Sequence, residues 1–176
     1  DFYMFEEVCK KQHAWQKQGK KIALSCNFTR DTISNVNFIK NVRSIMKKYP
    51  INYTYITIEI TEDAREKSLP TACSNIARCK ALGFKIAIDD MGSGYSSIKD
   101  LRHYCVDIVK VDRSVLMDAA TPAGMKSLKE IIVKAHKHGA KIVCEGVETE
   151  EQIHLLRSLG CDYLQGFYFG RPQKAI

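Results

Sequence analysis

The sequence predicts an α/β fold built from parallel βα units. Short apolar segments alternate with segments of helical spacing along the whole chain, which is typical of a parallel sheet covered by helices. Each of the six expected strands carries a polar residue at or near its end, and in a βα barrel these carboxyl ends form the active site. An open doubly wound sheet is the alternative, but the chain has no Gly-x-Gly-x-x-Gly phosphate loop.

The expected strands are runs of β-branched and apolar residues. They cover residues 22–27, 55–62, 86–89, 107–112, 141–145 and 162–167. Their polar residues are oxygen donors in most cases, with one cation among them: Asn27, Glu59, Asp89, Lys110, Glu145 and Gln165. Six such strands are hard to explain by packing alone.

The expected helices are bounded by recognisable start and stop signals. They cover residues 2–18, 38–48, 70–82, 96–104, 124–137 and 149–159. Pro70 lies in a first turn and Gly83 follows a last turn, as helix termini favour. Thr149 and Gln152 have the spacing of a capping box. The chain has no linker or low-complexity tract, so we expect one domain over residues 1–176.

Composition excludes several classes of protein. The 176 residues are 45% hydrophobic and 27% charged, as in a globular protein with a sizeable core. No apolar run approaches the ~20 residues of a membrane span. The seven cysteines lack metal-binding spacing and are expected to be reduced thiols, mostly buried, of a cytoplasmic protein. The net charge of +7 permits an anionic partner, but no nucleic-acid-binding motif accompanies it, so no polymeric nucleic acid is expected.

The segment Lys85–Gly94 is the centre of the functional prediction. An apolar run ends on the adjacent carboxylates of Asp89 and Asp90, followed by Gly92 and Gly94. Adjacent carboxylates repel each other, and a hard divalent cation such as Mg²⁺ or Mn²⁺ relieves that repulsion. A turn without chemistry is the alternative explanation for Asp and Gly at this spacing. The oxygen donors at the other strand ends favour the metal.

The chain resembles the EAL-domain family, bacterial phosphodiesterases that act on cyclic di-GMP. Six motifs in order carry the resemblance: Cys26–Thr29 (CNFT), Ile58–Glu62 (IEITE), Asp89–Ser97 (DDMGSGYSS), Val109–Arg113 (VKVDR), Glu145–Thr149 (EGVET) and Gln165–Phe167 (QGF). The resemblance implies a modified (βα)₈ TIM-type barrel with one antiparallel strand, present here as about six of eight units. We expect the first two strands, and the Glu-Ala-Leu segment with its metal ligand and an arginine, upstream of Asp1.

The resemblance also implies a role for each strand-end residue. Asn27, Glu59 and Asp89 would bind a first Mg²⁺ or Mn²⁺ ion, and Asp89 and Asp90 a second. Lys110 would contact the attacking water and the phosphate, and Glu145 would act as base or water ligand. The implied supporting residues are Glu62, Asp112, Glu148 and Gln165. The family pattern differs here at Met91, Ser93 and Cys144, where Phe, Thr and Ala are usual.

Three functions remain open on this basis. The first is hydrolysis of cyclic di-GMP to the linear dinucleotide by an intact protein that forms a homodimer, with residues 1–176 inactive alone. The second is an EAL-like receptor that binds cyclic di-GMP without cutting it. The third is an unrelated metal-dependent barrel hydrolase, which the lack of a His-x-His pair at a strand end disfavours.

Overall fold

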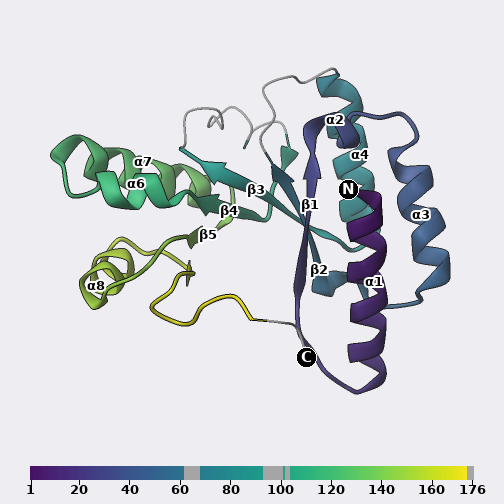
Figure 1. The fold of residues 1–176 in the computed structure, drawn as a ribbon. Coiled ribbons are helices and arrows are strands. Elements are labelled where there is room, and N and C mark those ends of the chain that lie inside the picture. Colours follow the sequence, from purple (N-terminus) through teal and green to yellow (C-terminus); the bar gives the residue numbers. More distant parts are fainter. Residues whose placement is uncertain (62–67, 93–100, 102–103, 174–176) are drawn as a thin grey trace. The chain divides into compact units, whose positions relative to one another are not determined.

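The structure is a computed structural model that describes residues 1–61, 68–92, 101 and 104–173 (Figure 1). These residues form two compact units. The first runs from Asp1 to Ile88 and includes a short later segment with Tyr104, and the second contains the rest. The division falls within one strand, between Ile88 and Asp89. No helix in the described part of the chain is both long and apolar enough to cross a membrane.

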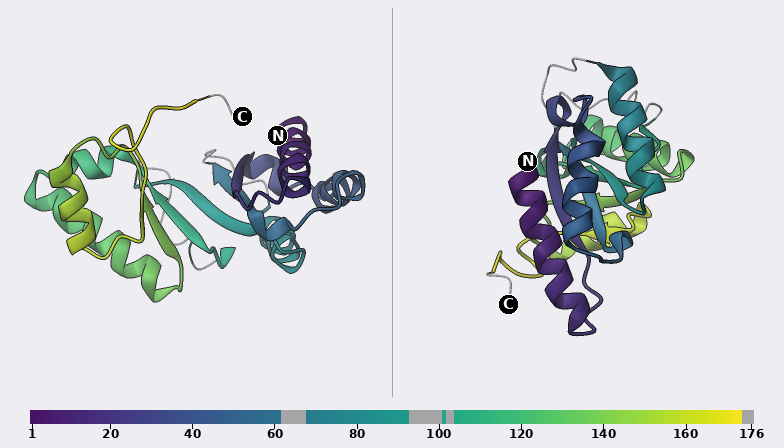
Figure 2. Two further views of the ribbon diagram at one scale, coloured as in Figure 1. Left: turned by 90° about the horizontal axis from the view of Figure 1, so that it is seen from below. Right: turned by 90° about the vertical axis from the view of Figure 1, so that its right-hand side faces the viewer.

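The first unit is a parallel three-stranded arrangement with helices packed along it. Its strands are β1 (Leu24–Thr29), β2 (Ile56–Thr61) and the start of β3 (Lys85–Met91), and they pair in chain order. Its helices are α1 (Phe2–Lys17), α2 (Arg30–Ile33), α3 (Phe38–Lys48), α4 (Leu69–Ala81) and the 3₁₀ turn η1 (Tyr53–Tyr55). Helix α3 packs against α1 and α4, and Figure 2 shows the three nearly end-on.

Aromatic side chains fill the space between α1 and the strands of the first unit. Phe5 and Phe28 are completely buried, with ring centroids 5.6 Å apart, and Phe5 also contacts Phe84 at 5.8 Å. Phe5 and Cys9 recur at helical spacing on α1, so one face of this helix enters the core. Phe28 alternates with exposed Asn27 on β1, as the period of a strand requires.

The second unit repeats the parallel pattern. Strands β4 (Ile108–Val111), β5 (Lys141–Cys144) and β6 (Tyr163–Leu164) pair in chain order. Its helices are α6 (Arg113–Asp118), α7 (Pro122–Lys137) and α8 (Glu150–Ser158), and α7 packs against α6 and β5. The capping box predicted at Thr149 and Gln152 is present at the start of α8. The prediction of an α/β fold from parallel βα units is confirmed.

Several predicted boundaries are wrong in detail, for local reasons. The final strand covers only Tyr163–Leu164, because Gln165 already contributes its backbone to the loop after β5. The strand expected over 107–112 ends at Val111, because Asp112 caps α6. Helices α2 and α6 were not expected, since four- and six-residue helices are too short for an apolar period. The helix expected over 96–104 lies almost wholly outside the described residues.

Candidate metal centre

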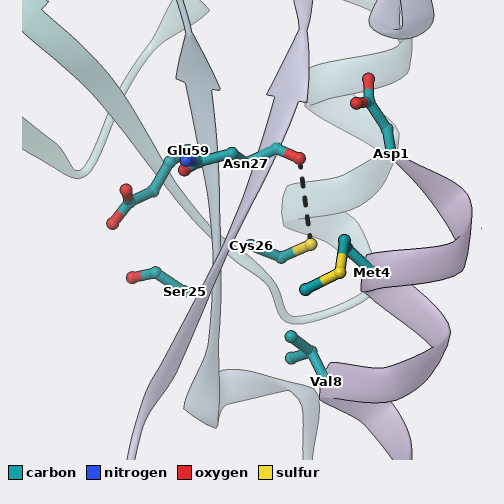
Figure 3. Close-up of a pocket in the computed structure, with 7 residues that line it drawn as sticks. All are labelled: Asp1, Met4, Val8, Ser25, Cys26, Asn27 and Glu59. Atoms are coloured by element: carbon teal, nitrogen blue, oxygen red, sulfur yellow. Dashed lines mark hydrogen bonds between the residues drawn. The ribbon is translucent and has the colours of Figure 1, made fainter. Parts of the chain in front are cut away.

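Asn27 and Glu59 form a neighbouring pair on the first unit. They are Cα partners in the parallel register of β1 and β2, so their side chains leave the strands on the same face. Figure 3 shows both side chains, with Ser25, on the side of β1 away from Cys26 and Met4. Glu59 is only 8% exposed. The pair lines a cavity of about 430 Å³.

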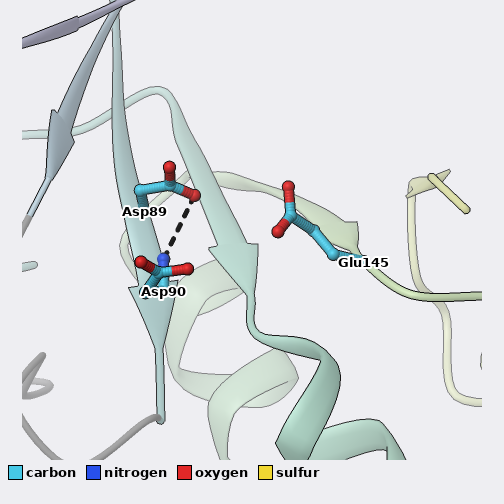
Figure 4. A group of neighbouring side chains, drawn as sticks. All are labelled: Asp89, Asp90 and Glu145. Carbon is cyan, nitrogen blue, oxygen red and sulfur yellow. Dashed lines mark hydrogen bonds between the residues drawn. The ribbon is translucent and has the colours of Figure 1, made fainter. Parts of the chain in front are cut away.

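Asp89, Asp90 and Glu145 form an acidic cluster in the second unit. One carboxylate oxygen from each residue lies within 4.8 Å of the other two. Asp89 and Asp90 are the end of β3, and Glu145 is the first residue after β5, so two strand ends create the cluster. Figure 4 shows the carboxylates of Asp89 and Glu145 turned toward one another. Of the five side chains predicted to lie within reach of one another, the structure shows these three together, and their role as metal ligands stays a prediction.

Lys110 is the cation of this cluster. Its Nζ lies 2.8 Å from Asp89 Oδ1 and 2.8 Å from Glu145 Oε1, and β4 places it between them. Its side chain is 12% exposed, so the two ion pairs are only weakly screened by solvent. Lys110 thus forms ion pairs with two of the three carboxylates of the cluster.

The surroundings of Glu145 make its charged form costly. Burial raises the pKa of the Glu145 carboxyl, and the negative charges of Asp89 and Asp90 raise it further. The hydrogen bond and positive charge of Lys110 act in the opposite direction. A divalent cation fits this donor set, because it prefers carboxylate oxygens and offsets the repulsion between neighbouring carboxylates.

The backbone of Asp90 is in the left-handed region, at φ 51°. Residues other than glycine rarely adopt this conformation, and such strain collects at functional sites. The Asp90 N–H donates to Asp89 Oδ1 at 3.1 Å. This hydrogen bond within the Asp-Asp pair holds the Asp89 carboxylate toward the cluster.

The predicted supporting residues have distinct positions. Asp112 accepts hydrogen bonds from the backbone N–H and hydroxyl of Ser114, which lower the pKa of its carboxyl and cap α6. Glu148 forms an ion pair with Arg113 at 2.9 Å. Gln165 lines a cavity of about 250 Å³ together with Glu145. Glu62 lies outside the described residues.

Arg113 is a residue of this site that sequence reasoning missed. Its aliphatic stem crosses Gly146, where an added Cβ would lie 2.3 Å from Arg113 Cγ, while its guanidinium pairs with Glu148. Gly146 also has a φ of 71°. Arg113 therefore fixes the loop that starts with Glu145 against the start of α6. The Glu-Gly pair after β5 was the available signal, since a glycine there permits a close approach.

A family model described as the EAL domain matches residues 1–172. The chain is 31% identical to the cyclic di-GMP phosphodiesterase NbdA of Pseudomonas aeruginosa, over 98% of the chain and 22% of that protein. It is 34% identical to the probable cyclic di-GMP phosphodiesterase PdeA of Escherichia coli, over 92% of the chain and 22% of that protein. The chain thus spans about a fifth of these relatives.

Solved structures share the fold. The PaMucR phosphodiesterase in complex with c-di-GMP superposes with a TM-score of 0.87 and 28% identity, over 99% of this chain and 71% of that one. The EAL domain of DcpA from Mycobacterium smegmatis superposes with a TM-score of 0.86 and 29% identity, over 96% of this chain and 77% of that one.

Proposed function

The chain belongs to the EAL domain family, and from this premise we propose that the intact protein hydrolyses cyclic di-GMP to the linear dinucleotide with two bound Mg²⁺ or Mn²⁺ ions. The observation that carries the proposal is the cluster of Asp89, Asp90 and Glu145 around Lys110. This cluster brings three carboxylates together beside Lys110, and carboxylate oxygens are the ligands that Mg²⁺ and Mn²⁺ prefer.

The proposed ligands come from neighbouring strands. Asn27 and Glu59 are register partners, and Glu59 is in turn the partner of Ala87 on β3. Asp89 follows Ala87 by two residues and therefore has the same strand parity. By resemblance to the family, Asn27, Glu59 and Asp89 are the proposed ligands of one ion, and Asp89 and Asp90 are the proposed ligands of a second. When bound, such ions polarise the phosphodiester and lower the pKa of water.

Lys110 and Glu145 are the proposed catalytic residues. Lys110 presents a fixed positive charge to a phosphate oxygen, where negative charge grows as water attacks phosphorus. Glu145 accepts the proton of that water as a general base. Their mutual ion pair at 2.8 Å keeps both groups directed at one point before substrate arrives. The P–O bond then breaks and the leaving oxygen acquires a proton, which opens the ring to the linear dinucleotide.

The substrate assignment is supported by the relatives. Two curated relatives are named cyclic di-GMP phosphodiesterases, one of them as probable, and one structural neighbour was solved with c-di-GMP bound. The net charge of +7 permits an anionic substrate such as this dinucleotide.

The test measures the conversion of cyclic di-GMP to the linear dinucleotide. The reaction contains Mg²⁺ or Mn²⁺, and chromatography separates substrate from product. Asp89→Asn should lower turnover by at least about 100-fold, and Asp112→Asn by less, about 10–100-fold, because it acts through α6. Asp118→Asn is the matched control, since this exposed carboxylate on α6 lies outside the cluster. Equal activity of the Asp89 and Asp118 variants would refute the assignment. Binding of cyclic di-GMP without turnover by the unmutated protein would favour a receptor instead.

A further inference from the structure

Helices α3 and α4 enclose a hollow on the first unit that shares no residue with the metal-binding groups. Its volume is about 550 Å³, and its lining consists of Val36, Ile39, Lys40, Arg43, Ser44, Lys47 and Arg78. The two helices pack against each other, so both walls of the hollow are fixed by the core of the unit.

Among the described residues that line this hollow, every charged side chain is positive. Neither α3 nor α4 contains an aspartate or glutamate. Lys40, Arg43, Lys47 and Arg78 are exposed, and within the described residues none of the four forms an ion pair. Other cations of the same helices are differently placed: Lys48 binds Glu6 at 2.9 Å.

Uncompensated charges on a single helix usually mean only a solvated face. Here the charges converge from two helices on a concave surface, which focuses their field and raises the local concentration of anions. Lys40, Arg43 and Lys47 have the spacing i, i+3, i+7 on α3 and form a stripe about 10 Å long, with Arg78 on the other wall.

The apolar residues of the hollow decide the class of partner. Val36 is 79% exposed at its rim, beside the buried Ile39. A duplex offers phosphates but no apolar side chain to cover Val36. Single-stranded nucleic acid stacks on aromatic side chains, and none of the described residues that line this hollow is aromatic. A protein segment supplies both kinds of group.

We propose that the hollow between α3 and α4 is a docking surface for an acidic amphipathic helix of a protein partner. Glutamates at helical spacing pair with Lys40, Arg43 and Lys47 along α3, and Arg78 closes the other side. An apolar side chain one turn away from the first glutamate covers Val36. This interaction is independent of cyclic di-GMP hydrolysis.

The test uses a fluorescein-labelled, alanine-rich helical peptide with glutamates at i, i+3 and i+7 and a leucine one turn before them. Fluorescence anisotropy gives its affinity for the protein. Replacement of Lys40 and Arg43 by Glu should weaken binding at least tenfold, which corresponds to about 1.4 kcal/mol. The matched control replaces Lys126 and Lys129 by Glu, which have the same spacing on the exposed face of α7. The control should change binding less than twofold.

Two further measurements separate the alternatives. Val36→Ser should weaken peptide binding about threefold to tenfold, and a peptide with glutamines in place of the glutamates should not bind. If the Lys40/Arg43 and Lys126/Lys129 variants lost the same affinity for the peptide, the effect would come from net charge alone. That result would overturn the proposal. Absence of peptide binding would also overturn it. So would tighter binding of a 20-base-pair DNA duplex that is insensitive to Val36→Ser, because the hollow would then be a nucleic-acid site. Circular dichroism shows whether each variant is folded.

Discussion

Lys110 Nζ lies 2.8 Å from Glu145 Oε1, and this contact joins the ends of two parallel strands at the acidic cluster. The same nitrogen is 2.8 Å from Asp89 Oδ1. Lys110 therefore offsets the repulsion between two of the carboxylates, and its proposed second task is to present a cation to the substrate.

Lys110→Met should separate these tasks. Turnover of cyclic di-GMP should fall about 100-fold or more, because a fixed positive charge near the phosphate is lost. Affinity for Mn²⁺, measured by calorimetry without nucleotide, should stay equal or rise, since a competing cation leaves the carboxylates. A fall in Mn²⁺ affinity as large as the fall in turnover would show that Lys110 only supports the ligands.

Gly146→Ala should destabilise the protein more than Gly139→Ala. Both glycines have a left-handed backbone, at φ 71° and 77°, so both variants incur the same strain of about 1–2 kcal/mol. Only at Gly146 would the new Cβ collide with Arg113, 2.3 Å from its Cγ, whereas nothing lies within 4 Å at Gly139. Urea unfolding measures both free energies.

Addition of Arg113→Ala to Gly146→Ala tests whether this collision is the cause. Removal of the side chain beyond Cβ should recover part of the lost stability. No recovery in the double variant, or equal costs at Gly139 and Gly146, would contradict the proposed packing.

Gln12→Met should stabilise the protein. Gln12 is completely buried on α1, and within the described residues neither its Oε1 nor its Nε2 has a hydrogen-bond partner. Removal of an unsatisfied polar group from a core should raise the free energy of unfolding by about 1–2 kcal/mol.

The matched control for Gln12 is Gln16→Met on the same helix. Gln16 accepts from the Asn52 N–H at 2.9 Å and donates to the Asn52 carbonyl at 3.2 Å. Its replacement should lower stability by about 1 kcal/mol. Changes of the same sign in both variants would mean that burial of Gln12 is not the controlling factor.

Asp162 should make stability depend on pH in the acid range. Burial pushes the pKa of its carboxyl upward, but hydrogen bonds from Lys141, the Ile142 N–H and His136 outweigh burial and lower this pKa to about 2, from 3.8. A lowered folded-state pKa stabilises the protein above the unfolded value, and the gain disappears as pH falls from about 4 toward 2. The shift corresponds to about 2 kcal/mol, and the side chain is only 15% exposed.

Asp162→Asn measures this contribution. The variant should be less stable than the unmutated protein by about 2 kcal/mol at pH 7, and the difference should shrink steadily below pH 4. Urea titrations at pH 7, 4 and 2.5 give the three differences. A difference that is the same at all three pH values would refute the link to ionisation of Asp162.

The sequence by itself determined the fold class, and it predicted a site at the carboxyl ends of the strands. Parallel strands bring their carboxyl ends to one edge, so the strand-end positions of Asp89, Asp90 and Glu145 were enough to predict that they meet. The capping box at Thr149 and Gln152 was equally predictable, because both groups belong to one helical turn. That Asn27 and Glu59 join this cluster around a metal remains a prediction.

Only the tertiary structure decided which side chains from different strands touch. Their spacing along the chain predicted that Lys110 and Asp112 lie on the same face of a strand. In the structure the strand ends before Asp112, which caps α6, and Lys110 lies between two carboxylates. The contact of Arg113 with Gly146 spans 33 residues and has no local pattern at all. Local propensity fixes the period and the ends of an element, whereas contacts between elements depend on register, side-chain length and packing, which are settled only when the strands assemble.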